Sequence, residues 1–111
     1  MNLNNLTIKT QEALQRAQQI AMEHSNPVIE QGHLFKGILE IDESVTPFIF
    51  KKLGVNIAVT KKAVDSIIAS YGKGEAAQPY MSRTAAEAIQ KAHTFLKTFV
   101  TLKIHRVSEY Y

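Results

Sequence analysis

Histidines are the residues of this chain whose chemistry could support metal binding or hydrolysis. A zinc or hydrolytic site on a helix needs two ligands at i, i+4 spacing, as in His-Glu-x-x-His. No two of the four histidines have that spacing: they are His24, His33, His93 and His105. We therefore expect no metal site. We interpret His33 as a hydrogen-bonded residue at a helix start, and His24 and His93 as helix-surface or boundary residues.

Two carboxylates, Glu12 and Glu87, occupy matching positions in two similar segments. A general acid and base must approach one substrate and need pKa values that are pushed apart, and nothing in the sequence indicates either. We interpret both as exposed residues near helix N-termini, where negative charge is favourable. The chain also lacks Gly-x-x-x-x-Gly-Lys-Ser/Thr, the phosphate-binding loop of ATPases. We expect no catalytic residue, no cofactor and no enzyme activity.

The composition is that of one ordinary globular domain. The chain has 111 residues, of which 45% are hydrophobic and 21% charged, and it contains no cysteine. The absence of cysteine fits a reducing compartment. No apolar run approaches the roughly 20 residues of a membrane span. We therefore expect a cytoplasmic protein with no membrane contact. The net charge is +3, but the lysines come in pairs, Lys51-Lys52 and Lys61-Lys62, rather than in a stripe. We expect no nucleic-acid binding. A protein that did bind nucleic acid would be retained by DNA or RNA, and this retention would weaken steeply with salt.

The elements that position these residues include a repeated helix. The segment from Thr7 to Ala17 recurs, 75 residues later, from Ser82 to Ala92, and each copy begins with a hydroxyl residue that can cap a helix. Thr7 is thus a predicted cap. The apolar positions of the first copy follow i, i+3, i+4, i+7 spacing. The second copy repeats this face at Ala85, Ala88, Ile89, Ala92, Phe95, Leu96 and Phe99.

Five helices are predicted in all. The first runs over residues 7–24 and ends before Pro27. The second covers 31–41, with Gly37 permitting a close helix contact. Ser44 caps a third helix that ends at Gly54, and Asn56 caps a fourth that ends near residue 71. The fifth covers 82–99. The inward-facing residues predicted for the middle three helices are Leu34, Ile38 and Ile41, then Phe48, Ile49 and Leu53, then Ile57, Ala63, Val64, Ile67, Ile68 and Tyr71.

The sequence divides into one complete four-helix unit and an incomplete second one. Residues 1–71 form the first repeat, 72–81 a linker loop rich in glycine, and 82–99 the first helix of a second repeat. Residues 100–111 alternate apolar and polar side chains at first, as a strand does. We expect a single all-α domain, 1–111, with an atypical strand-like tail.

These motifs resemble the N-terminal repeat domain of the Clp ATPase chaperones, most closely the ClpB branch. The resemblance rests on Leu6-Thr7, Gln11-Glu12-Ala13-Leu14, Ile29-Glu30, His33-Leu34 and Lys52-Leu53-Gly54-Val55. It implies an all-α helical bundle of two repeats placed ahead of ATPase modules. It departs from the family at Gly32, where relatives have an acidic residue that some ClpC-type proteins use, with the threonine of the first helix, to hold phosphorylated arginine. It departs again after Phe99, where the rest of a second repeat is missing, as in a truncated or rearranged chain or a natural fragment.

The resemblance implies a protein-binding module that engages unfolded or aggregated clients, or adaptors, for delivery to an ATPase ring. The residues expected to contact a client are Thr7, Leu14, Ile89, Phe95 and Phe99. The alternative is a stand-alone Clp-repeat adaptor or regulator of a Clp protease or chaperone. Because the apolar face of the fifth helix lacks the rest of its repeat, we also expect a homodimer through this helix and the tail.

Overall fold

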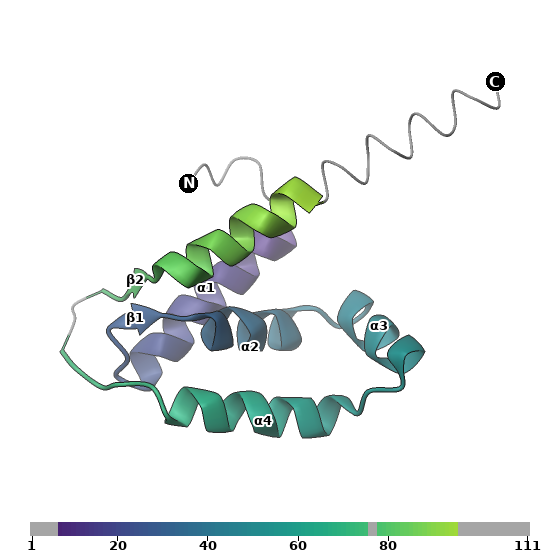
Figure 1. Cartoon of the computed structure of the whole chain (residues 1–111), viewed down its shortest axis with the longest axis horizontal. Helices are drawn as coiled ribbons and strands as arrows, with labels where there is room; N and C mark the ends of the chain where they lie inside the picture. The colour runs from purple at the N-terminus through teal and green to yellow at the C-terminus, as the bar shows by residue number, and fades with distance from the viewer. Residues whose placement is uncertain (1–6, 76–77, 96–111) are drawn as a thin grey trace.

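The computed structural model describes residues 7–75 and 78–95 and shows an all-α fold, as predicted. Helices occupy all five predicted places within these ranges, and the last of them is helical over residues 83–95. Two short strands accompany them (Figure 1). The bounds are α1 (Ile8–Glu23), β1 (Val28–Ile29), α2 (Gln31–Ile41), α3 (Val45–Leu53), α4 (Ile57–Ala69) and β2 (Tyr80–Met81).

The predicted helix ends are confirmed where they depend on local chemistry. Thr7 Oγ1 accepts a hydrogen bond from the backbone N–H of Thr10 at 3.1 Å. Asn56 Oδ1 accepts one from Ala58 N–H at 2.9 Å. Gly54 ends α3 with a φ of 71°, a left-handed conformation that suits glycine. Each of these residues satisfies backbone groups that a helix end leaves without intrahelical partners.

The predicted cap of α3 was wrong. Ser44 makes no side-chain capping bond, and the carboxylate of Asp42 takes its place. It accepts hydrogen bonds from the backbone N–H groups of Ser44, Val45 and Thr46 at 3.0, 2.9 and 2.8 Å. The Thr46 hydroxyl donates a fourth bond, and these bonds together hold the pKa of Asp42 well below its usual range. A carboxylate two residues earlier serves better than a serine because it accepts several donors at once.

Removing the cap of α4 tests this account of helix ends. We expect Asn56→Ala to lower the free energy of unfolding by about 1 kcal/mol, because two backbone N–H groups at the start of α4 lose their acceptor. Ser44→Ala is the matched control and should change it by less than about 0.5 kcal/mol. Urea unfolding followed by circular dichroism measures both. Equal losses in the two variants would contradict the assignment.

The α1 and α2 helices cross closely at small residues. A Cβ atom added to Gly37 would lie 2.5 Å from the backbone oxygen of Ala13 and 3.3 Å from the nitrogen of Ala17. Both alanines are buried. The predicted close contact at Gly37 is confirmed, and it brings the backbones together where larger side chains would hold them apart.

Two clusters of buried apolar side chains form the core. The first lies where α1, β1 and α2 meet the start of the last helix, and it consists of Ala17, Ala21, Ile29, Leu34 and Ala85. The second joins α1, α2 and α4 through Ile20, Leu39, Val64 and Ile68. The repeated helix therefore contributes to the same core as α1, through one alanine.

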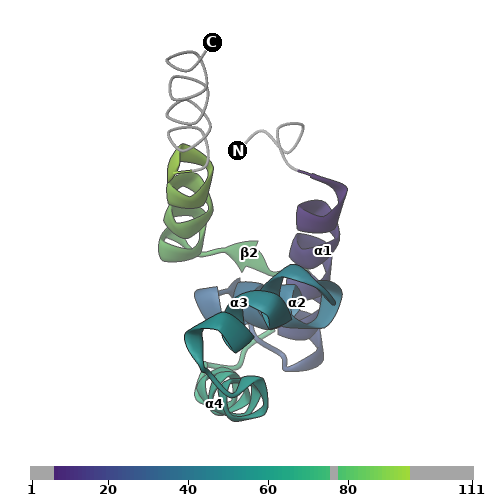
Figure 2. The same ribbon diagram turned by 90° about the vertical axis from the view of Figure 1, so that its right-hand side faces the viewer.

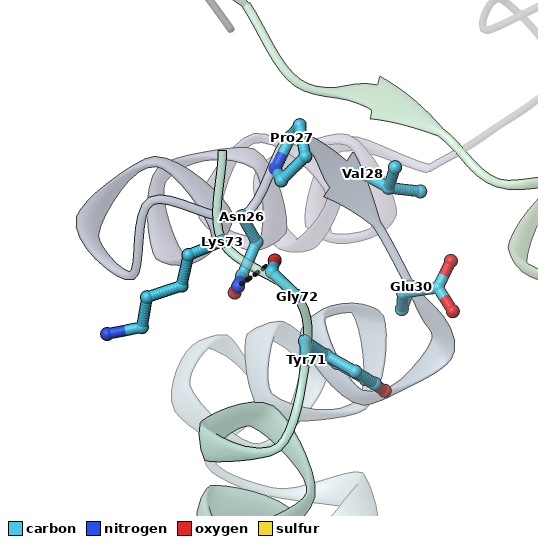
Figure 3. Close-up of a pocket in the computed structure, with 7 residues that line it drawn as sticks. All are labelled: Asn26, Pro27, Val28, Glu30, Tyr71, Gly72 and Lys73. Atoms are coloured by element: carbon cyan, nitrogen blue, oxygen red, sulfur yellow. Dashed lines mark hydrogen bonds between the residues drawn. The ribbon is translucent and has the colours of Figure 1, made fainter. Parts of the chain in front are cut away.

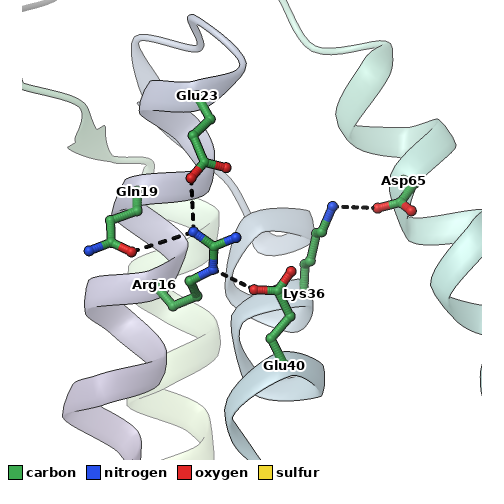
Figure 4. Close-up of polar contacts among 6 residues, drawn as sticks. All are labelled: Arg16, Gln19, Glu23, Lys36, Glu40 and Asp65. Carbon is green, nitrogen blue, oxygen red and sulfur yellow. Dashed lines mark hydrogen bonds and ion pairs between the residues drawn. The ribbon is translucent and has the colours of Figure 1, made fainter.

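Ion pairs bridge the outer edges of these helices (Figure 4). Arg16 on α1 contacts the carboxylates of Glu40 on α2 and Glu23 on its own helix, and the two hydrogen bonds raise its pKa further. Lys36 on α2 contacts Asp65 on α4 at 2.7 Å. Because all these side chains are partly exposed, each pair contributes at most about 1 kcal/mol. Their main effect is to orient α2 relative to α1 and α4.

The expected linker ends in a strand that the sequence analysis did not predict. β1 and β2 pair in parallel, with Val28 opposite Tyr80 and Ile29 opposite Met81. The ladder extends to Ser82, whose N–H donates to Ile29 O at 2.9 Å, and Gly74 N–H donates to Ser25 O at 3.0 Å. The linker between α4 and the last helix is thus hydrogen-bonded near both of its ends to the segment that follows α1 (Figure 1).

The predicted inward face of α3 was wrong. Phe48, Ile49 and Leu53 are exposed, and Phe50 contacts the body instead, with its ring centroid 6.3 Å from that of Phe35. Ile38 and Ile67, also predicted inward, are exposed as well, and so is Ala63. An apolar stripe shows that one helix face is apolar, but it does not show that the same chain covers it. The predicted strand-like tail, 100–111, lies outside the described residues.

Candidate functional site

The two repeated helices begin with the same capping geometry. In the first copy Thr7 caps α1, and its Oγ1 lies 2.8 Å from Thr10 Oγ1. In the second copy Ser82 Oγ accepts from Ala85 N–H at 3.1 Å and lies 3.2 Å from the Thr84 hydroxyl. Thr7 is exposed. Its capping role is confirmed.

The structure brings two of the predicted client-binding residues together. Leu14 on α1 and Ile89 on the last helix are both half-buried and pack against the first core cluster, as does Met81. Phe95, farther along the same helix, is 73% exposed. Phe99, the remaining candidate, lies outside the described residues. Of the predicted client-binding residues, Leu14 and Ile89 are thus half-buried on two neighbouring helices, and Phe95 is exposed.

The start of α1 and the C-terminal described part of the last helix extend away from the rest of the domain. Figure 2 shows the start of α1 and the last helix on the same side of the molecule, with α4 on the opposite side. Along the last helix Ala85 is fully buried, Ile89 half-buried and Ala92 exposed. Within residues 83–95, the apolar stripe predicted for this helix is thus buried at its first turn, half-buried at Ile89 and exposed at Ala92 and Phe95.

A buried polar network lies at the opposite end of α1. His33 is fully buried and Asn26 is 3% exposed. Glu30 N–H donates to His33 Nδ1 at 2.9 Å, so this nitrogen carries no proton. The proton therefore lies on Nε2, which donates to Asn26 Oδ1 at 2.9 Å. Asn26 Nδ2 donates in turn to the Gly72 carbonyl at 3.1 Å. The predicted hydrogen-bonded role of His33 at a helix start is confirmed.

Burial lowers the pKa of His33. The Glu30 carboxylate opposes this shift and His24 adds to it, but burial has the largest effect. The ring of Tyr71 lies 5.0 Å from the His33 ring, centroid to centroid. The neutral imidazole thus connects α2, the segment after α1 and the end of α4. Asn26 and Tyr71 were not predicted as members of this network, because their spacing from His33 carries no motif.

A cavity of about 370 Å³ adjoins this network (Figure 3). The side chain of Asn26 points across it to the Gly72 carbonyl, while Lys73 extends outward. Its lining is mainly apolar and contains none of the predicted client-binding residues. The lining residues are Asn26, Pro27, Val28, Glu30, Tyr71, Gly72 and Lys73.

Gly32 lies where the resemblance leads one to expect an acidic residue. Its N–H donates to the Tyr71 hydroxyl at 3.1 Å. A Cβ atom at this position would lie 2.5 Å from the same hydroxyl. A side chain at position 32 and the present position of Tyr71 therefore exclude each other. Position 32 therefore carries no carboxylate, and its backbone N–H donates to the Tyr71 hydroxyl instead.

The two glutamates at matching positions of the repeat, Glu12 and Glu87, lie on the protein surface. Glu87 pairs with Arg83 one helical turn away, at 3.0 Å, and both Glu87 and Glu12 are exposed. Across residues 7–75 and 78–95, no three His, Asp, Glu or Cys side chains gather as metal ligands. No helix in the same ranges is long and apolar enough to cross a membrane.

Comparison with known families agrees with this geometry. Residues 5–103 match the model of the Clp repeat (R) N-terminal domain. The chain belongs to this family. A chaperone protein ClpB from Bacteroides thetaiotaomicron is 41% identical over 97 residues, which is 87% of this chain and 11% of that protein. A ClpB from Porphyromonas gingivalis is 36% identical over 107 residues, 93% of this chain and 12% of its own length.

This Clp repeat domain thus spans about one tenth of the length of the curated relatives that it matches. Family membership and the helical repeat fold, both expected from the sequence, are confirmed. The matched range includes the whole described part of the last helix, so the second copy of the repeated helix belongs to the family pattern and is not an unrelated addition.

Proposed function

We propose that this Clp repeat domain binds exposed apolar segments of unfolded or aggregated proteins, or of adaptors, and delivers them to an ATPase ring. The relatives are named as ClpB chaperones, and this domain corresponds to a small part of such a protein. The proposal places it in the cytoplasm, where a chain without cysteine is compatible with reducing conditions.

The observation that carries the proposal is the uncovered apolar face of the last helix. Phe95 is 73% exposed, although this helix begins in the first core cluster. A large aromatic side chain on a fixed helix offers an extended apolar client a contact that requires no rearrangement of the domain. Leu14 and Ile89 form the base of the binding surface, Thr7 its polar edge, and Phe99 continues it along the predicted helix.

Weak binding suits such a role, because a client must leave the domain to enter the ring. A few half-exposed apolar residues contribute limited free energy after the cost of ordering the client. The same face is our candidate for self-association, which light scattering at rising concentration measures. Self-association would compete with client binding.

Substitution of Phe95 tests the proposal. We expect Phe95→Gln to weaken binding of fluorescently labelled casein, a permanently unfolded protein, about tenfold, which is the effect of losing roughly 1.4 kcal/mol of contact. Fluorescence anisotropy measures the affinity. Met22→Gln is the matched control, because Met22 is also an exposed apolar residue but lies on the last turn of α1. Equal weakening by both variants, or by neither, would refute the proposed surface.

A further inference from the structure

The α3 helix turns its apolar stripe away from the domain. Val45, Phe48, Ile49 and Leu53 have i, i+3, i+4 and i+8 spacing and are all exposed, Leu53 by 69%. The opposite face, with Phe50, contacts the body. Val55 in the following turn and Val59 at the start of α4 are exposed too. We call these six residues the α3 surface: Val45, Phe48, Ile49, Leu53, Val55 and Val59.

The concentration of apolar side chains here is unusual. Single exposed apolar residues are normal on any protein, but six of the twelve exposed large hydrophobic residues of the described chain fall between positions 45 and 59. Figure 1 shows α3 and the adjoining start of α4 at one end of the molecule. Contiguous exposed apolar surface of this kind usually marks an interaction site.

Lysines are the only charged residues from Val45 to Val64, whereas Asp42 and Glu43 come just before this stretch and Asp65 just after it. Asp42 caps α3, and Asp65 pairs with Lys36. Four lysines and no acidic residue occur between Val45 and Val64. All four are exposed, and none of them forms a salt bridge with a carboxylate of the described chain. Lys52 extends over the Phe48 ring, 5.6 Å from its centroid. The lysines concerned are Lys51, Lys52, Lys61 and Lys62.

The charge and the spacing of these side chains indicate which kind of partner the α3 surface fits. A second copy of this surface would bring lysines against lysines, which disfavours self-pairing. A lipid surface would also match the charge, and it is the competing outcome of the test below. A stripe at i, i+3, i+4 spacing has the ridge geometry that packs against another helix. The combination favours a helix with an apolar face and acidic flanks.

We propose that the α3 surface docks an acidic amphipathic helix of a partner protein. The apolar face of the partner helix covers the stripe of α3, and its carboxylates face the four lysines. This interaction is separate from client binding, because it uses α3 and the start of α4 and none of the residues assigned to the client. It would attach the domain to a partner while the last helix remains available.

A synthetic peptide tests this proposal. The probe is a labelled amphipathic helix with leucine at i, i+3, i+4, i+7 positions and glutamate elsewhere. Its control replaces each glutamate by lysine. We expect the acidic peptide to bind the 111-residue chain with an affinity that falls as salt rises, and the basic peptide to bind at least tenfold more weakly. NMR shift changes should concentrate at residues 45–64.

Variants locate the binding. The double variant Phe48→Gln, Leu53→Gln should weaken acidic-peptide binding about tenfold, and Phe95→Gln should leave it unchanged. Lys51→Glu, Lys52→Glu should also weaken it about tenfold, whereas Lys9→Glu, Lys91→Glu changes the net charge equally and should have little effect. Unchanged binding by the α3 variants overturns the proposal. So does equal binding of the basic peptide, preferential binding to phosphatidylglycerol vesicles, or a dimer of this chain that the α3 variants abolish.

Discussion

Replacing Gly37 by alanine is expected to lower the free energy of unfolding by about 2 kcal/mol. Alanine is the better helix former by up to about 1 kcal/mol, so helix propensity alone predicts the opposite sign. Sterics decide the outcome, because the new Cβ would lie 2.5 Å from Ala13 O and 3.3 Å from Ala17 N. Both obstacles are backbone atoms, which cannot rotate away. The α1 and α2 helices must therefore separate.

Gly72→Ala is the matched control for this substitution. No atom lies within 4 Å of a Cβ added at Gly72, and its φ is not positive. We expect a change of less than about 1 kcal/mol, in the stabilising direction if any, because alanine restricts the unfolded chain. Thermal and urea unfolding of both variants measure the difference. A Gly37→Ala variant as stable as the Gly72→Ala variant would contradict the close helix crossing.

Replacing His33 by alanine is expected to cost roughly 3 kcal/mol at neutral pH. The substitution leaves a cavity where a fully buried ring was, and it removes the partners of Asn26 Oδ1 and Glu30 N–H. Asn26 also holds the Gly72 carbonyl, so the damage should reach the start of the connection to the last helix. Urea unfolding measures the loss, and hydrogen exchange at Gly74 N–H reports on the connection.

The cost of this substitution should depend on pH. Because burial lowers the pKa of His33 in the folded state, the unfolded chain takes up a proton first as the pH falls below about 6.5. The wild type is therefore most stable with respect to this group above that pH and loses stability below it. The variant lacks this loss, so the difference between the two proteins should shrink in acid. His93→Ala is the control, and a constant difference from pH 7 to pH 5 would contradict the buried neutral histidine.

Features that depend on neighbouring residues were predictable from the sequence. Thr7, Asn56 and Ser82 cap helices because a short polar side chain there reaches backbone donors two or three residues on. Gly54 ends α3 because glycine tolerates a positive φ. The predicted cap at Ser44 was wrong, because Asp42, two residues earlier, reaches the same backbone donors.

Features that depend on distant residues were not predictable. The stripe on α3 has the same period whether a helix or solvent lies against it, so burial of Phe48 and Leu53 was inferred wrongly. The β1–β2 pairing involves two residues on each side, which is too short for an alternating pattern to show. Tyr71 was predicted to face inward, but its bond to Gly32 could not be read from a separation of 39 residues.

The candidate site was predicted in part. The repeat placed Leu14 and Ile89 at equivalent positions, and the structure packs both on one cluster. Two residues at equivalent positions of a repeat pack in the same way only if the elements that contact them are also repeated. Ala17 is buried by α2, whereas Ala92, its counterpart, is exposed because no second α2 lies beside it in the described chain. That asymmetry leaves Phe95 uncovered.

The parallel pairing of β1 and β2 sets an order of assembly for this chain. Val28 and Tyr80 are far apart in sequence, and closing the loop between them costs chain entropy that two short strands return only in part. We therefore expect the ladder to form after α1, α2 and α4 have packed, because their packing brings the ends of that loop together. During synthesis the first repeat is made before the second. The second copy of the helix is therefore the last part of this core to be made, and Ala85 completes the first core cluster.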